Sequence, residues 1–393
     1  MNLEVRRLDY PRQILGLTSL RFFAAYWVVL HHLDDALRPN IDAYSGLLRK
    51  GYLAVDVFFI LSGFVLCHVY WKDGLSGRLD YWNFLSKRLA RIYPMHIVTM
   101  ALMGLLVAIG VVTGVPVDAT AYVGNVMANL LLIHAWGTTP GLSWNAVSWS
   151  ISAEWFAYLI FPVALAVGLR FRARPAVLVA LAAMCLVLLV FLVRRIGGTG
   201  LFHLQADYAM LRIAPEFVLG CALYGLGRSF SLGARTTTVA TTVVAAAIVL
   251  GAHFSVPDTA LVLCGAALVF LLAETSRNGS LSWLASPRLV HLGEISYSTY
   301  MIHGVVQVAY FATAAKLGGW PAASMPPLLV LPAILLVHLG SVASYAWIER
   351  PGRFWLHAVL RRENLFRTGP AEPARPAPPL PAATTPGISL ASP

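Results

Sequence analysis

The sequence predicts an all-α protein, a polytopic transmembrane helix bundle of about ten spans with both termini in the cytoplasm. Of its 393 residues, 58% are hydrophobic and only 12% are charged, whereas roughly 25% are charged in an ordinary soluble domain. The mean hydropathy is +0.70. Apolar runs recur from near the N-terminus to about residue 350, so a single integral membrane domain over 1–352 is the simplest organisation.

Individual spans follow from length, because about 20 mostly apolar residues cross roughly 30 Å of hydrocarbon. The stretch 121–136 is shorter and contains two Asn and one His. It is either an interfacial or re-entrant helix or an eleventh span. The segments that satisfy the length criterion are 15–34, 51–70, 94–114, 150–169, 175–194, 208–226, 236–254, 258–274, 289–311 and 326–347.

Charge distribution indicates the topology. The formal net charge is +11, but the basic residues form short clusters between apolar runs, which argues against a nucleic-acid-binding face. With the N-terminus inside, most of the 29 Lys and Arg residues fall in cytoplasmic segments, which predicts cytoplasmic termini. These residues are Arg6, Arg7, Arg12, Lys72, Arg78, Lys87, Arg88, Arg91, Arg170, Arg172, Arg174, Arg228, Arg235, Arg277, Arg288 and those from Arg350 to Arg375.

The two ends of the chain and the cysteines carry no predicted chemistry. The first apolar run lacks a small-residue cleavage site, so it is expected to be a retained helix and not a signal peptide. The Pro/Ala-rich segment 364–393 is expected to be a disordered cytoplasmic tail. No CxxC or Cys/His spacing occurs, so neither a disulfide framework nor a metal site is predicted for Cys67, Cys185, Cys221 and Cys264.

Several ionisable residues lie inside predicted spans, where each is costly unless it faces a cavity or a partner. Arg21 and His32 are eleven residues apart, which places them within about 20° of one helical face and roughly 16 Å apart along the axis. We expect both to line one cavity. Further groups at the middle or in the outer half of the bilayer predict a shared polar chamber; they are Asp56, Glu154, Arg212, Glu216 and His303. Arg212 and Glu216 are one turn apart and could also pair with each other.

Arg88 and Arg91 have i, i+3 spacing at the predicted cytoplasmic boundary, in FLSKRLARIYPMH. Two guanidinium groups at this spacing suit a diphosphate or phosphomonoester, to which each can donate two hydrogen bonds. The alternative is that they are ordinary cytoplasmic basic residues.

Taken in order, these motifs resemble the acyltransferase-3 family, which includes polysaccharide and Nod-factor O-acetyltransferases and macrolide acyltransferases. The resemblance covers about 13–352. It rests on LRFFAAYWVVLHH, GYLAVDVFFILSGFVL, RLARIYP, SWSISAEWFAYLIFP, RIAPEFVLG, LGEISYSTYMIH and WIERP. It implies a multi-pass enzyme of the bacterial inner (cell) membrane. Such an enzyme transfers an acyl group, acetyl being expected, from acyl-CoA to a hydroxyl of a carbohydrate-type acceptor.

The resemblance also implies roles for individual residues. Arg21 and His32 match the hallmark pair of the family, and Arg88 with Arg91 match its donor-binding Arg-x-x-Arg motif. Glu154 matches the Glu of the Trp-Ser-x-Ser-x-Glu motif. Two departures bear on acceptor specificity: Trp155 replaces a second acid, and Gly304-Val305 replaces the x-Pro that often follows the ninth-helix histidine.

The resulting mechanistic hypothesis makes His32 a general base toward the acceptor, or a transient acyl carrier, with Glu154 or Asp56 orienting its imidazole. Arg21, Arg88 and Arg91 are assigned to the donor. His303 and Arg212 are assigned to the substrate, with interhelical hydrogen bonding as the alternative for His303.

Two other functional classes remain at this point. A secondary transporter or flippase could use the same buried groups as a proton or substrate pathway, and broken helices in symmetric positions would favour it. A sensor or scaffold would pair its polar groups in a dry core without a cavity. The acceptor, the acyl length, the side of modification and the oligomeric state are open from the sequence.

Overall fold

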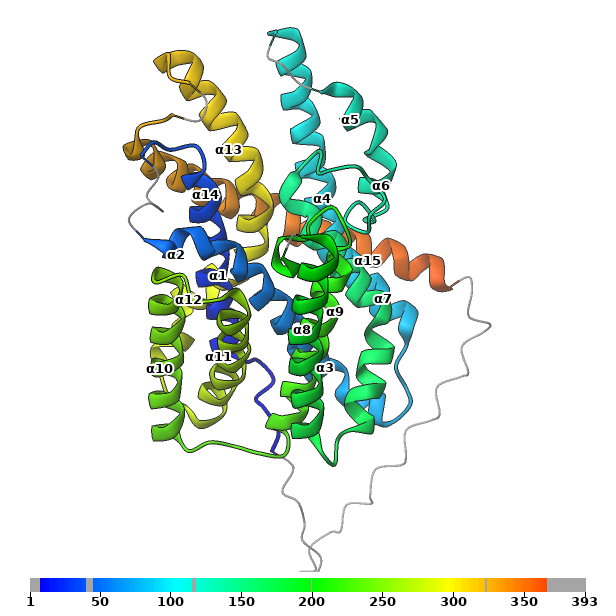
Figure 1. Ribbon diagram of the computed structural model, residues 1–393. Coiled ribbons are helices and arrows are strands. Elements are labelled where there is room, and N and C mark those ends of the chain that lie inside the picture. Colours follow the sequence, from blue (N-terminus) through cyan, green and yellow to red (C-terminus); the bar gives the residue numbers. More distant parts are fainter. Residues whose placement is uncertain (1–7, 40–44, 115–117, 199, 322–323, 366–393) are drawn as a thin grey trace, which may run out of the picture.

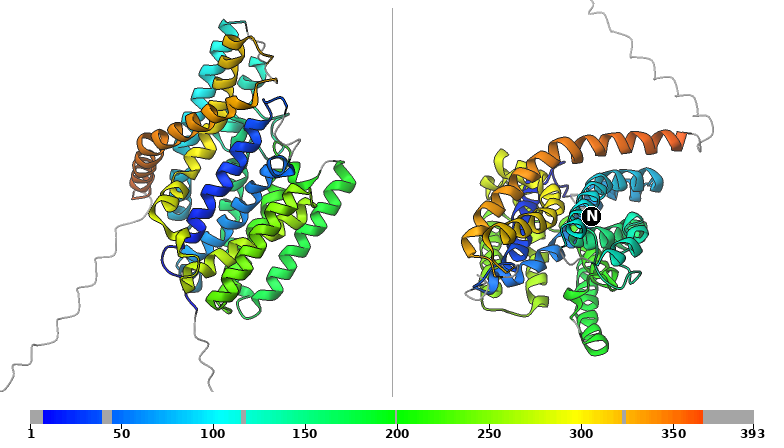
Figure 2. Two further views of the ribbon diagram at one scale, coloured as in Figure 1. Left: turned by 90° about the vertical axis from the view of Figure 1, so that its left-hand side faces the viewer. Right: turned by 90° about the horizontal axis from the view of Figure 1, so that it is seen from above.

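The computed structural model describes residues 8–39, 45–114, 118–198, 200–321 and 324–365. In these residues the regular secondary structure is helical, apart from one isolated bridge between Leu37 and Met325, so the predicted all-α class is confirmed. The helices form one bundle in which α4 and α13 extend furthest toward the top of Figure 1. Two further views show that α14 and α15 run on from each other along one edge of the bundle (Figure 2).

The helices are α1 (Leu15–Asp34), α2 (Gly46–Arg49), α3 (Ala54–Leu75), α4 (Tyr81–Val112), α5 (Ala119–Gly124), α6 (Val126–Leu130), α7 (Trp149–Arg170), α8 (Pro175–Gly197), α9 (Ala209–Gly227), α10 (Ala234–His253), α11 (Asp258–Asn278), α12 (Pro287–Glu294), α13 (Ser296–Gly318), α14 (Val330–Ser344) and α15 (Arg350–Leu365). Short 3₁₀ turns are η2 (Lys50–Leu53), η3 (Ala146–Ser148), η4 (Leu201–His203), η5 (Ser282–Ala285) and η6 (Pro327–Leu329), and η7 (Tyr345–Glu349) is a π-helical turn.

Eight helices in the described part of the chain are long and apolar enough to cross a membrane, and they correspond to eight of the ten predicted spans. The other two predicted spans, 15–34 and 289–311, form α1 and the α12–α13 pair, which are helical but carry more polar residues. The segment 121–136 contains only α5 and α6, which are too short to cross a bilayer.

The ten-span count and the cytoplasmic position of both termini stay predictions. Arg6 and Arg7 lie outside the described residues, as does the predicted tail from residue 366 onward. α15 continues to Leu365, two residues into the segment 364–393 that was predicted to be disordered.

Local sequence signals account for where helices begin and end. α8 starts with Pro175, whose missing N–H costs nothing in a first turn, and ends before Gly198, which has a left-handed φ of +69°. Asp80 precedes α4, and its side chain accepts a hydrogen bond from the backbone N–H of Asn83. The sequence around these two helices therefore also contains the residues that start or end them.

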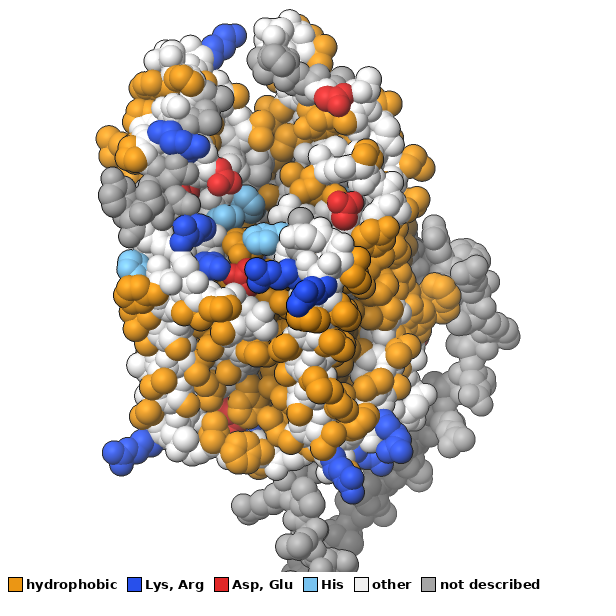
Figure 3. All heavy atoms as spheres, in the orientation of Figure 1, with side chains coloured by type: hydrophobic (Ala, Val, Ile, Leu, Met, Phe, Trp, Pro, Cys, Tyr) orange, Lys and Arg blue, Asp and Glu red, His pale blue; other side chains and the backbone are white. Residues whose placement is uncertain are grey.

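The most buried helices are α3 and α9, with 67% and 72% of their apolar windows inside the bundle, against 17% for α8 and α10. Figure 3 shows the consequence on one face: a broad hydrophobic band with Lys and Arg side chains at its upper and lower margins. Such a band matches the hydrocarbon layer of a bilayer. The outer helices therefore present their apolar side chains to lipid.

α3 packs most extensively against α9, and two glycines permit this close contact. A Cβ atom at Gly63 would overlap the carbonyl oxygen of Phe217, and one at Gly220 would overlap that of Ile60. The two helix backbones touch at these points, as is common where small residues line a contact between membrane helices.

We expect Gly220→Ala to destabilise the bundle by about 1–3 kcal/mol or more, because the added methyl group forces α3 and α9 apart. The measurement is the thermal unfolding of the purified protein in detergent. Gly124→Ala is the matched control, since a Cβ at this helical glycine meets no atom within 4 Å. Equal melting temperatures for Gly220→Ala and the parent would contradict the tight contact.

Candidate active site

A cavity of about 500 Å³ lies among α1, α3, α4, α7 and the α12–α13 segment. Its outer rim includes the exposed residues Arg12, Val69 and Glu294, so it opens at the end of the bundle where α1 begins. Its inner part reaches the buried residues Ser150 and Tyr300. The cavity therefore extends from this end of the bundle to the first turn of α7 and the second turn of α13.

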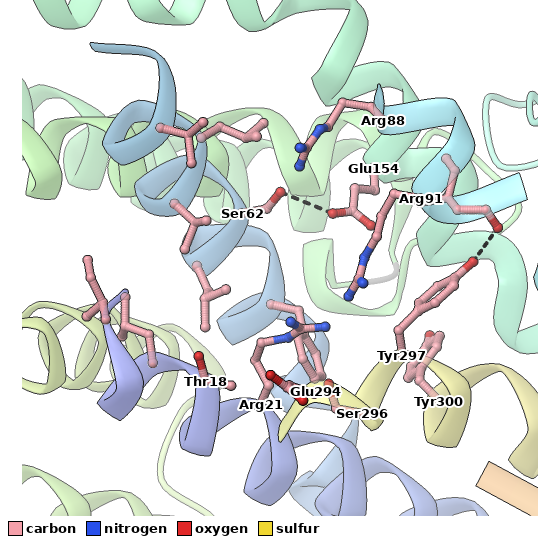
Figure 4. Close-up of a pocket in the computed structure, with 18 of the residues that line it drawn as sticks. Thr18, Arg21, Ser62, Arg88, Arg91, Glu154, Glu294, Ser296, Tyr297 and Tyr300 are labelled. Carbon is pink, nitrogen blue, oxygen red and sulfur yellow. Dashed lines mark hydrogen bonds between the residues drawn. The ribbon is translucent and has the colours of Figure 1, made fainter. Parts of the chain in front are cut away.

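Five arginines and two glutamates line this cavity, so its charge is positive; they are Arg12, Arg21, Arg88, Arg91, Arg353, Glu154 and Glu294. Figure 4 shows Arg21 on α1 and Arg88 and Arg91 on α4 directed into the same space. Among the described residues, neither Arg21 nor Arg88 donates a hydrogen bond, and Arg88 Nε is buried without a partner. Because a buried cation without an acceptor is costly, the cavity fits an anionic ligand that supplies oxygen acceptors.

Arg91 is held in place by Glu349, which lies on the π-helical turn between α14 and α15. Arg91 Nη1 is 2.9 Å from Glu349 Oε1, and Ser298 Oγ donates to Glu349 Oε2 at 2.6 Å. The side chain of Glu349 is 2% exposed. The Tyr297 ring lies 5.6 Å from the Arg91 guanidinium carbon. This buried acid fixes the direction of Arg91, and π-helical turns often occur at functional sites.

Glu154 on α7 also points into the cavity, beside Arg88 and Arg91 (Figure 4). Its Oε1 atom accepts hydrogen bonds from Ser62 Oγ at 3.1 Å and from Tyr158 OH at 2.6 Å. These two donors come from α3 and from the next turn of α7. They hold the carboxylate against the cavity wall and help to stabilise its negative charge.

His32 and His303 form a pair near the other end of α1. His303 is fully buried, and its Nδ1 is 2.5 Å from the carbonyl oxygen of Tyr300. A carbonyl oxygen only accepts, so His303 Nδ1 is the donor, and in the neutral ring Nε2 is an acceptor. His303 Nε2 lies 3.2 Å from His32 Nδ1, which is also 3.1 Å from the carbonyl oxygen of Val28.

These contacts determine the tautomer of His32. Both neighbours of its Nδ1 are acceptors, so Nδ1 carries the proton and Nε2 has a free lone pair. Within the described residues, Nε2 has no hydrogen-bond partner. An imidazole in this state can accept a proton from a hydroxyl group at Nε2.

Asp56 and Arg212 form a buried ion pair between α3 and α9. Arg212 Nε and Nη2 lie 2.6 Å from the two carboxylate oxygens of Asp56, and Nη2 also donates to the carbonyl oxygen of Tyr52 at 3.3 Å. The Trp149 ring lies 5.0 Å from the guanidinium carbon. Neither charged residue lines the cavity, so the geometry supports a structural role in joining two helices.

The structure corrects three sequence-based expectations. A single chamber does not enclose all the polar groups: Arg21, Arg88, Arg91 and Glu154 line the cavity, whereas His32, His303, Asp56 and Arg212 do not. The imidazole of His32 is oriented by His303 and Val28, and not by Glu154 or Asp56. Arg212 pairs with Asp56 across two helices, and not with Glu216 one turn away.

Arg21 and His32 are both on α1, but they are eleven residues apart along it and do not line the same space. Arg21 reaches the cavity, and His32 lies beyond its inner end. The connection between them is Tyr300, which lines the cavity and packs against His303 with ring centroids 5.6 Å apart. The Tyr300 hydroxyl accepts from Ser150 Oγ at 2.7 Å and donates to the carbonyl oxygen of Val147 at 2.9 Å.

Some site residues could not be found from sequence reasoning. Glu349 lies in the WIERP motif, and nothing in its local sequence points to Arg91, 258 positions earlier. Ser62 and Tyr300 carry no distinguishing local signal. Tyr158 could have been found, because it is four residues after Glu154 and so lies on the same helical face.

A helical membrane bundle with an arginine-lined cavity and a histidine pair in contact with the cavity wall has the architecture of an integral membrane enzyme. The sequence profile described as an acyltransferase domain, Acyl_transf_3, matches residues 14–346, so the chain belongs to the acyltransferase-3 family. It is therefore a multi-pass membrane enzyme that transfers acyl groups other than amino-acyl groups.

Individual relatives agree with this membership. The chain is 28% identical over 372 residues to "Acyltransferase MdmB" of Streptomyces mycarofaciens, covering 86% of this chain and 90% of that protein. It is 24% identical over 380 residues to "O-acetyltransferase OatA" of Staphylococcus aureus, covering 89% of this chain and 59% of that protein. No solved structure matches the chain.

We expect Asp56→Asn or Arg212→Gln alone to destabilise the protein by about 3–5 kcal/mol, because each leaves a buried charge without its partner. The double variant removes both charges and should cost less than either single change. Thermal unfolding in detergent measures this, with Asp73→Asn at the exposed end of α3 as the control. Additive losses in the double variant would contradict the pairing.

Proposed function

We propose that this protein transfers an acyl group, acetyl being expected, from acyl-CoA to a hydroxyl of a carbohydrate-type acceptor. The observation that carries the proposal is an arginine-lined cavity whose inner wall, at Tyr300, contacts a histidine pair with a proton-accepting nitrogen. The family and the O-acetyltransferase relative support the reaction class.

The donor fits the cavity by charge. Coenzyme A carries a diphosphate and a phosphomonoester, and the cavity offers Arg21 and Arg88 without competing acceptors, together with Arg91 oriented by Glu349. Guanidinium groups donate paired hydrogen bonds to phosphate oxygens. With the phosphates at the arginines, the acyl end of the donor extends toward Ser150 and Tyr300.

The chemistry at His32 follows from its tautomer. As the acceptor oxygen bonds to the acyl carbon, its proton passes to Nε2 of His32 and the carbon–sulfur bond breaks. The imidazolium then returns this proton to the departing thiolate. His303 is a positioning residue, because its Nε2 accepts from Nδ1 of His32 and so stabilises the imidazolium. A transient acyl group on Nε2 of His32 would use the same lone pair.

The competing functional classes have less support. A sensor or scaffold was expected to pair its polar groups in a core without a cavity, whereas this bundle contains one of about 500 Å³ with unpaired arginines. A transporter or flippase is disfavoured by membership of an acyltransferase family. The bacterial relatives and the basic cavity end favour a bacterial cell membrane with the donor on the cytoplasmic side.

Arg88→Ala should weaken the binding of CoA about ten-fold or more, because a charge-assisted hydrogen bond to phosphate contributes about 1.5–3 kcal/mol. Isothermal titration of CoA into the protein in nanodiscs measures the dissociation constant. Lys87→Ala is the control, since Lys87 precedes Arg88 on α4 but does not line the cavity. Glu349→Gln should give a smaller loss, because Arg91 keeps its charge and loses only its orientation. Unchanged binding in Arg88→Ala would place the phosphates elsewhere.

His32→Ala should lower kcat about 10²–10⁴-fold and leave CoA affinity unchanged, because it removes the base and no donor contact. Transfer of labelled acetyl from acetyl-CoA to glycans by the protein in lipid is the measurement.

His303→Gln, whose amide oxygen can still accept from His32, should retain more activity than His303→Leu. His338→Ala is the control, since this histidine on α14 bonds Tyr26 away from the pair. Full activity in His32→Ala would remove His32 from the mechanism.

A further inference from the structure

A continuous row of rings extends from the buried side chain of His303 to the protein surface. Successive ring centroids are separated by 5.1 Å between His303 and His32, 5.2 Å between His32 and His31, 5.7 Å between His31 and Tyr52, and 4.9 Å between Tyr52 and His203. His303 is fully buried and His203 is exposed. We call these five residues the ring row.

The ring row approaches His32 from the end of the bundle opposite the cavity mouth. The cavity takes its residues from the first half of α1, up to Arg21, whereas the ring row begins at the last turn of this helix. Figure 3 shows histidine side chains exposed in a recess below the upper parts of the bundle. A molecule lying on the ring row would therefore reach His32 without passing through the cavity.

The backbone holds Tyr52 against His31. A Cβ at Gly51 would lie 2.6 Å from both the Cβ of His31 and the carbonyl oxygen of Trp27, so only glycine lets η2 pack this closely on α1. The Tyr52 hydroxyl donates to Asp258 Oδ2 at 2.8 Å, which anchors the ring from its polar end. These two contacts hold the Tyr52 ring in one position.

The polar atoms of the ring row suit hydroxyl groups. His31 Nδ1 lies 3.0 Å from the carbonyl oxygen of Leu48, so Nδ1 donates and Nε2 is an acceptor. The His203 side chain has no hydrogen-bond partner among the described residues. Asp258 is paired with Lys50, so these two charges neutralise each other. The row therefore offers apolar ring faces and imidazole nitrogen atoms, and no net charge from this ion pair.

We propose that the ring row binds the acceptor and that its ligand is a neutral sugar ring with a free hydroxyl. The C–H face of a sugar can lie on the Tyr52 and His203 rings, while its hydroxyls meet the imidazole nitrogens. This orientation directs one hydroxyl along the row to Nε2 of His32. The inference deepens the proposed function and rests on it, since it identifies the acceptor side of the same reaction.

The test uses the full chain in nanodiscs with methyl glucoside and methyl N-acetylglucosaminide as probes. His203→Ala and Tyr52→Ala should raise the acceptor KM about ten-fold or more, because each removes a ring face. The KM for acetyl-CoA and the slow hydrolysis of acetyl-CoA without acceptor should not change. Tyr52→Phe keeps the ring but loses the hydrogen bond to Asp258 that anchors it, so its KM should rise less than that of Tyr52→Ala. Phe254→Ala removes an exposed aromatic ring at the end of α10 and serves as the control.

A binding measurement separates this proposal from the reaction itself. Saturation-transfer NMR should show methyl glycoside signals with the parent and with Phe254→Ala, and weaker signals with His203→Ala, whether or not transfer occurs. Absence of transfer together with this binding pattern would overturn the acyl transfer and keep the sugar site. Transfer with an unchanged acceptor KM and unchanged NMR signals in both alanine variants, with melting temperatures equal to the parent, would overturn the ring-row proposal.

Discussion

The hydrogen bond between His303 and His32 is the interaction on which the proposed chemistry depends. The carbonyl oxygen of Tyr300 fixes the proton of His303 on Nδ1, which makes Nε2 of that ring an acceptor and places the proton of His32 on its own Nδ1. The carbonyl oxygen of Tyr300 on α13 acts through two rings, together with that of Val28 on α1, to leave Nε2 of His32 as the nitrogen that can take a proton. In the proposed reaction, His303 takes the place that a carboxylate has in many catalytic pairs.

The remaining architecture keeps α1 and α13 together within a membrane. α3 and α9 form the centre, where Gly63 and Gly220 allow backbone contact and Arg212 pairs with Asp56. This ion pair is buried in the bundle but does not line the cavity. Charged residues inside the membrane can therefore join helices without taking part in the reaction. The cavity arginines are different, because Arg21 and Arg88 donate no hydrogen bond within the described residues and can bind the proposed anionic donor.

α1 connects the two ends of the site. Arg21 faces the cavity in the first half of this helix, and His31 and His32 lie at its other end as part of the ring row. The histidine pair between them is the point at which a donor and an acceptor from opposite ends could meet. A rigid helix suits this arrangement, because it keeps the two binding regions at a constant distance.

The sequence by itself determined the class of fold, eight of the membrane helices and the family, because these depend on apolar run length and on motifs read within single segments. Helical periodicity also correctly grouped neighbours on one helix, such as Arg88 with Arg91. Only the tertiary structure decided that His303 orients His32, that Glu349 orients Arg91 and that Asp56 holds Arg212 away from the cavity. These partners are separated by 271, 258 and 156 positions, and helix periodicity relates only residues within a few turns. Contacts between distant helices arise from how the whole bundle packs.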